Sequence, residues 1–235
     1  MGETEIIMIR HYKGYLGQFE YDDKEWKVYK GEASLFPALE YLHYEGIKDG
    51  KEIVIPKGVR DCSGMFEGCA FLTTSPVIPN GVRNCYMMFY GCTSLTKPPV
   101  IPDEVKDCSL MFMGCTSLVT SPIIPEGVTD CRWMFKKCTS LTTVPVIPKG
   151  VTNCIGMFME CTSLVTSPII PQGVTNCRFM FEGCTSLTTS PVIPDGVEDC
   201  SRMFYGCTSL TTPPIIPDGV EDYSLMFMGC TSLTL

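Results

Sequence analysis

The stretch CTSLTTSPVIPDGVEDCSRMFYGCTSLTTPP at residues 184–214 contains the string CTSLTT twice, 23 residues apart. Met-Phe pairs recur at the same interval, and their phenylalanines are Phe66, Phe89, Phe112, Phe135, Phe158, Phe181, Phe204 and Phe227. A unit of this length cannot bury its own apolar face, so successive units must stack with equivalent residues above one another. The sequence therefore predicts a solenoid of eight 23-residue repeats over residues 53–235.

Each repeat is predicted to contain a short strand, a Pro-x-Gly turn and a short helix. The run T-S-L-T-T-x-P-(V/I)-I-P-x-G suits a brief strand that the turn closes, because Val and Ile favour strands while Pro limits their length. In DCSRMFYGC, residues 199–207, the apolar side chains have the i, i+3, i+4, i+7 spacing of one helical face. Asp199 stands at the expected N-cap and Gly206 near the expected C-terminal end.

All 15 cysteines fall in two columns of the repeat, Cys62 to Cys200 and Cys69 to Cys230. Their odd number leaves at least one thiol unpaired in any intramolecular disulfide scheme. The C-x6-C spacing lacks a zinc knuckle, and no histidine follows His43. We interpret the cysteines as small buried hydrophobes and expect no metal and no cofactor, with a disulfide ladder as the alternative.

The full pattern, C-T-S-L-T-T-x-P-(V/I)-I-P-x-G-V-x-(D/N)-C-x2-M-F-x-G-C, resembles the BspA-like, or Treponema pallidum-type, class of leucine-rich repeats. Units of that class have a similar length and a hydrophobe-Phe-x-x-Cys signature. The resemblance covers residues 53–235, although this chain has Cys where the class often has Ile and shifts the proline and the following valine by one place. It implies a leucine-rich-repeat solenoid and protein–protein or adhesive binding.

Residues 1–52 do not repeat. Alternating apolar and polar residues around Asp22-Asp23 suggest a β-hairpin, and the segment that follows is ambiguous between helix and strand. We expect a small N-terminal α/β cap that shields the first coil, with a separate recognition module as the alternative. The last coil has no such segment after it, so we expect it to pair with a second copy as a homodimer or to be closed in another way.

Composition bears on the class of function. A net charge of −8 without a Lys/Arg-rich run argues against direct binding of nucleic acid. No secretory signal and no apolar run of membrane-spanning length is evident, so we expect a cytoplasmic protein without a membrane contact. No repeat places a base beside its cysteines, and no phosphate-binding or metal motif occurs, so we expect no catalytic residues and no enzyme activity.

Partner-specific chemistry should lie in the columns that vary between repeats. On the expected helix, the variable positions lie opposite the Cys/Met/Phe face and point outward. They form an aromatic and basic face that we expect to bind a protein; its residues are Tyr90, Met113, Arg132, Trp133, Lys136, Met159, Arg178, Phe179 and Tyr205. The alternative is that neighbouring coils cover these side chains.

A second variable column changes sign along the stack; it consists of Arg60, Arg83, Lys106, Thr129, Thr152, Thr175, Glu198 and Glu221. Its last members belong to an acidic end formed by Asp195, Glu198, Asp218 and Glu221. Stacked like charges cost stability unless a basic partner or a cation relieves them, although a solvated end that aids solubility has the same composition.

The leading hypothesis is a non-enzymatic protein-binding solenoid that acts by occupancy of a macromolecular partner. One alternative is an acidic inhibitor of a basic, nucleic-acid-handling host protein, of phage or mobile-element type. The other is a self-assembling, adhesin-like structural protein.

Overall fold

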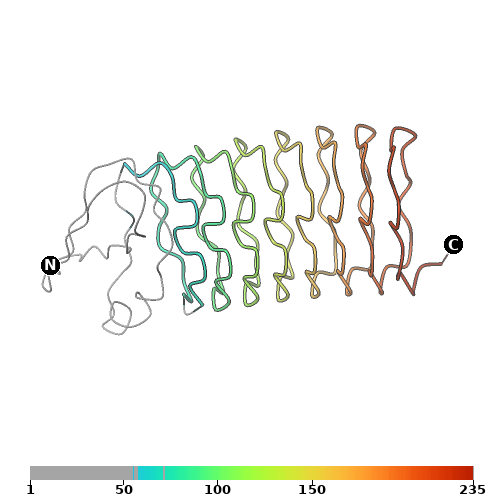
Figure 1. Ribbon diagram of the computed structural model, residues 1–235, viewed down its shortest axis with the longest axis horizontal. Helices are drawn as coiled ribbons and strands as arrows, with labels where there is room; N and C mark the ends of the chain where they lie inside the picture. The colour runs from blue at the N-terminus through green and yellow to red at the C-terminus, as the bar shows by residue number, and fades with distance from the viewer. Residues whose placement is uncertain (1–54, 56–57, 71, 235) are drawn as a thin grey trace, which may run out of the picture.

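The computed structural model describes residues 55, 58–70 and 72–234. Figure 1 shows these residues wound into a row of similar coils that advance along one axis. Eight isolated parallel bridges join them, each between residues 23 positions apart, such as Asp107 and Asp130. The predicted solenoid is therefore confirmed for the described coils. The cap predicted at residues 1–52 lies outside the described residues.

The short helix and the short strand predicted in each repeat are both wrong for the described coils, which contain no helix and only isolated bridges in place of strands. The second residue after the first cysteine has a φ of 53–60° in every coil; these residues are Gly64, Met87, Leu110, Trp133, Gly156, Phe179, Arg202 and Leu225. A left-handed residue cannot continue a right-handed helix. The Met111 N–H instead donates to the Cys108 carbonyl at 3.2 Å, which closes a four-residue turn with Leu110 at its third position.

Amides in this segment alternate between two kinds of hydrogen bond. The Met113 N–H donates back to the Leu110 carbonyl at 3.1 Å, within the coil. The Phe112 N–H donates to the Met134 carbonyl of the next coil at 2.9 Å. In an α-helix every interior amide would bond within its own segment, and none would be left to join one coil to the next. Consecutive turns satisfy the backbone and join the coils together.

The Asp and Asn residues predicted as helix caps begin these turns instead. Asp199 Oδ1 accepts a hydrogen bond from the Ser201 N–H at 2.8 Å, which is an Asx turn. The equivalent bond forms in the other described coils, with donors Ser63, Tyr86, Ser109, Arg132, Ile155, Arg178 and Ser224. The sequence analysis was therefore right that these Asp and Asn side chains accept a hydrogen bond from a nearby backbone N–H. It was wrong about the element, because they begin a turn rather than a helix.

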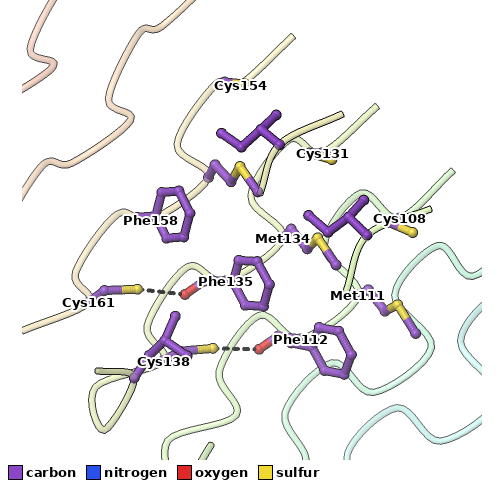
Figure 2. Close-up of a cluster of buried hydrophobic side chains, with 14 of the residues drawn as sticks. Cys108, Met111, Phe112, Cys131, Met134, Phe135, Cys138, Cys154, Phe158 and Cys161 are labelled. Atoms are coloured by element: carbon purple, nitrogen blue, oxygen red, sulfur yellow. Dashed lines mark hydrogen bonds between the residues drawn. The ribbon is translucent and has the colours of Figure 1, made fainter. Parts of the chain in front are cut away.

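The core is a set of side-chain columns that run through the stack. Phenylalanine rings of adjacent coils stack with centroids 5.4–5.9 Å apart and planes 2–8° apart. Figure 2 shows Phe112, Phe135 and Phe158 in this column, with a column of methionines beside it. The offset stacking of parallel rings is a favoured aromatic geometry, so each ring buries its faces against its equivalents.

The cysteines form two further columns. Fourteen of the fifteen are buried, Cys230 is half-buried, and all are free thiols, so their interpretation as small buried hydrophobes is confirmed. Each described thiol from Cys92 onward in the second column also donates to a phenylalanine carbonyl of the preceding coil. Figure 2 shows two of these bonds, from Cys138 Sγ to Phe112 O at 3.1 Å and from Cys161 Sγ to Phe135 O at 3.0 Å.

The buried thiols predict a steep loss of stability at alkaline pH. Burial raises the pKa of Cys62 and of Cys154 to about 12, whereas an unfolded cysteine titrates near 8.5. Below about pH 8.5 the thiols are protonated in both states and their contribution is fully present. Above that pH the unfolded chain releases protons that the folded chain retains, so the free energy of unfolding falls by about 1.4 kcal/mol per pH unit for each cysteine.

We therefore expect the midpoint of urea unfolding to fall sharply between about pH 9 and pH 11 under reducing conditions. Thiolate ultraviolet absorbance should rise together with the loss of circular dichroism. A gradual thiol titration near the unfolded pKa, with the fold intact, would contradict burial of these columns.

Candidate protein-binding surfaces

An aromatic–cationic patch, defined here as Trp133, Lys136, Arg178, Phe179 and Arg202, lies along the turn segments of neighbouring coils. Trp133 and Phe179 occupy the left-handed position in coils that are separated by the coil of Gly156. Their ring centroids are nevertheless 5.9 Å apart, with planes 28° apart. A Cβ atom at Gly156 would lie 1.9 Å from Trp133 Cζ3. The indole therefore leans across the intervening coil and fills the space that the missing side chain leaves.

Cations lie against the rings of this patch. Lys136 Nζ is 4.8 Å from the Trp133 ring centroid, and Arg178 Cζ is 4.5 Å from that of Phe179. Arg202 Cζ lies 5.4 Å from the Phe179 centroid and 4.5 Å from that of Tyr205. These distances are within the range of cation–π attraction. The patch thus combines the two residue classes that dominate many protein interfaces, aromatic rings and arginine.

Glu182 holds Arg202 in this position. The Arg202 Nη2 donates to Glu182 Oε1 at 3.2 Å, and Arg202 Nε lies 3.1 Å from Oε2 in a charge contact without hydrogen-bond geometry. Glu182 is buried, and this burial raises the pKa of its carboxyl, while the charge of Arg202 opposes the shift. The Glu182 carboxylate thus orients the Arg202 guanidinium between two aromatic rings.

The structure brings some residues of the predicted aromatic and basic face together, but most of that face is half-buried. Arg132 and Arg178 are exposed, and the others are half-buried: Tyr90, Met113, Trp133, Lys136, Met159, Phe179 and Tyr205. Arg132 is occupied by an ion pair with Asp130 at 2.7 Å. Among the described residues, Tyr90 makes no ring or cation contact like those of the patch. The predicted face is therefore smaller and better packed than the sequence suggested.

The acidic end is open. All four of its carboxylates are exposed, and none takes part in the ion pairs found within the described part of the chain. The Glu221 N–H donates to the Glu198 carbonyl at 2.8 Å, which places these two residues at equivalent positions of adjacent coils. Within the described residues, no group of three or more His, Cys, Asp or Glu side chains is arranged to hold a metal ion.

The most exposed apolar surface was missed by the sequence analysis. It is the Val/Ile stripe, in which every side chain is 77–90% exposed; its members are Val77, Val100, Ile123, Val146, Ile169, Val192 and Ile215. The next residue in each P-(V/I)-I-P run points the other way, so Ile147 and Ile170 are only 4% exposed. Extended backbone sends successive side chains to opposite sides. The sequence contained a signal for this stripe, because only one of two consecutive β-branched residues in an extended segment can face the core.

A family model and one solved structure support the solenoid architecture. The family model for the BspA type leucine rich repeat region (6 copies) matches residues 42–131 and 109–234. The crystal structure of a T. pallidum leucine-rich repeat protein is 25% identical, with 78% of each chain covered and a TM-score of 0.54. A leucine-rich repeat protein from Bacteroides ovatus is 21% identical over 94% of this chain and 70% of that one, with a TM-score of 0.49. No curated protein matches the chain.

No helix among the described residues has the length and apolar character needed to cross a membrane.

The position of the Trp133 ring leads to a spectroscopic prediction. In a Trp26→Phe background, which leaves Trp133 as the only indole, Gly156→Ala should expel the ring from its place, because the new methyl group would occupy the same space. We expect a red-shifted fluorescence emission and stronger quenching by a soluble quencher. Ala at this left-handed position should also lower the stability by about 1–2 kcal/mol.

Gly91→Ala is the matched control, because Gly91 is also left-handed, with a φ of 71°, and its added Cβ would meet no heavy atom closer than 3.7 Å. An emission spectrum that is unchanged by Gly156→Ala would show that Trp133 does not cover the intervening coil.

Proposed function

Because the chain belongs to the BspA-type leucine-rich repeat family, whose members generally bind proteins and are typically non-enzymatic, we propose that it is a protein-binding solenoid that acts by occupancy of a macromolecular partner. The Val/Ile stripe carries this proposal. We place the activity in the cytoplasm, where a reducing environment keeps thiols free.

The stripe has the properties of a preformed contact surface. Its seven side chains are β-branched and stiff, so they lose little rotamer freedom when a partner covers them. Burial of each one is worth about 1.5–3 kcal/mol. Backbone bonds between coils hold the preceding residues in place, such as the bond from the Thr142 N–H to the Val119 carbonyl at 3.0 Å. An exposed apolar row of this length favours an elongated partner surface.

A column of threonines, interrupted by the exposed Val119 and Val165, lies four residues before the stripe residue of each coil. The Thr142 hydroxyl donates to the Val119 carbonyl at 3.2 Å, and the Thr188 hydroxyl donates to the Val165 carbonyl at 3.2 Å. Each hydroxyl has thus used its proton and can only accept a further hydrogen bond. An apolar core with a polar rim is the usual anatomy of a protein interface, and these threonines supply part of such a rim. The aromatic–cationic patch supplies a second contact surface in this proposal.

A double substitution in the stripe tests the proposal. Val146→Lys/Ile169→Lys changes two side chains that are 84% and 89% exposed, so the fold should be retained. Buried lysine charges in the interface should weaken the complex at least about tenfold. Thr185→Lys/Thr208→Lys is the matched control, because it adds the same charge at exposed positions outside the stripe. The partner is first isolated from an extract of the source organism by affinity capture on the wild-type chain. Calorimetry then compares the affinity of that partner for the wild type and for each variant.

The acidic end favours a second candidate, an inhibitor that presents carboxylates to a basic, nucleic-acid-handling host protein, of phage or mobile-element type. Its support is the exposure of all four carboxylates. Glu198→Lys/Glu221→Lys in the same experiment separates the two. The contact would lie at the acidic end if this variant loses the partner while the stripe variant still binds it. The affinity of the wild-type chain should then also fall steeply with salt.

Self-association through the last coil stays a prediction. Tyr223, Leu225 and Met228 of that coil are 54–57% exposed, which provides apolar area for such a contact.

A further inference from the structure

The column that changes sign, called here the charge-graded column, is a regular array. All eight members, from Arg60 to Glu221, are exposed. Each backbone amide from the second member onward donates to the carbonyl of the preceding member; for example, Lys106 N–H donates to Arg83 O at 2.8 Å. The side chains are therefore presented once per coil along one line. Seven steps of about 4.8 Å make this line about 34 Å long.

When two copies of this column are aligned in opposite directions, positive residues of one copy face negative residues of the other. Three cations are followed by three threonines and two carboxylates. When a second copy lies alongside in the opposite direction, Arg60 faces Glu221 of that copy and Arg83 faces its Glu198. The middle of the column, Thr129 and Thr152, then lies on the twofold axis. A copy in the same direction would instead place every cation against its own equivalent.

A neighbouring column selects the register of this antiparallel arrangement. It is called the turn column and contains the residue that follows the last proline of each P-(V/I)-I-P run. Its described members are all exposed: Asn80, Asp103, Glu126, Lys149, Gln172, Asp195 and Asp218. With the twofold axis in the same place, Glu126 faces Lys149 of the second copy. No two residues of like charge then face each other in the described part of the column. A shift of one coil either way places Lys149 against Lys149 or Glu126 against Glu126. The charge-graded column thus favours the antiparallel direction, although a shift of one coil would still pair Arg83 with Glu221 and Lys106 with Glu198. The turn column then selects the register.

We propose that two copies of this chain associate side by side and antiparallel through the charge-graded and turn columns. Such an interface is isologous, so each favourable pair occurs twice. Exposed ion pairs fix direction and register more than affinity. The neutral threonines at the centre lose less hydration on contact than charges would. A strip about 34 Å long must be about 24 Å wide to reach the roughly 800 Å² per partner of a standard interface, so the contact extends to columns beside these two.

Charge reversal tests the alignment. Wild-type protein at low salt should have a mass twice that of the 26.0 kDa chain by light scattering. Arg83→Glu or Glu198→Arg alone should raise the dimer dissociation constant at least about tenfold, because each places like charges together at two symmetric points. An equimolar mixture of the two variants should restore the dimer, because the new carboxylate of one then faces the new guanidinium of the other. High salt should weaken the wild-type dimer.

Circular dichroism and the urea midpoint establish that each variant is folded, and Leu233→Glu is the control for pairing through the last coil. It should leave the mass unchanged. A wild-type monomer at every concentration and salt, single variants that dimerise as the wild type does, or a mixture that stays monomeric would each overturn the proposal. A dimer abolished by Leu233→Glu but indifferent to Arg83→Glu would assign the contact to the last coil.

Discussion

The hydrogen bonds that run along the solenoid axis are the constraint on which the rest of the structure depends. In the turn segment every second amide, such as those of Leu110, Phe112 and Gly114, donates to the next coil rather than to its own. This arrangement requires a left-handed residue in each turn and keeps equivalent residues in register. The register then stacks the phenylalanine rings, and it lets each second-column thiol from Cys92 onward reach a carbonyl in the coil before it.

The same register turns each variable column into a straight array on the surface. Val or Ile at the same position of successive coils forms the Val/Ile stripe. Side chains that change from positive through neutral to negative at another position form the charge-graded column. Substitution at such positions changes the surface without disturbing the axial bonds, because those bonds come from the backbone. A solenoid of this kind can therefore hold a fixed core and still acquire specific contacts, by the choice of residue in a few outward columns.

Sequence reasoning predicted the repeat, the stacking and the buried Cys/Met/Phe columns, because these follow from the interval and from apolar periodicity. It predicted a helix wrongly because consecutive β-turns give the same i, i+3, i+4, i+7 spacing of inward side chains. Gly64 and Gly156 mark the left-handed position, but Trp133 and Phe179 occupy it in other coils and hide the signal. The contact between those two rings depends on the missing side chain at Gly156, a relation across three coils that no local pattern contains.

Amide hydrogen exchange, followed residue by residue, is the most direct measurement of the axial bonds. The account predicts that the amides of Phe112, Phe135 and Phe158, which donate to the next coil at 2.9 Å, exchange as slowly as those of Met111, Met134 and Met157, which close turns within a coil. Both sets should then open only when the stack unfolds. Fast exchange of the phenylalanine amides beside protected methionine amides would contradict the account, because the coils would then be held together by side chains alone.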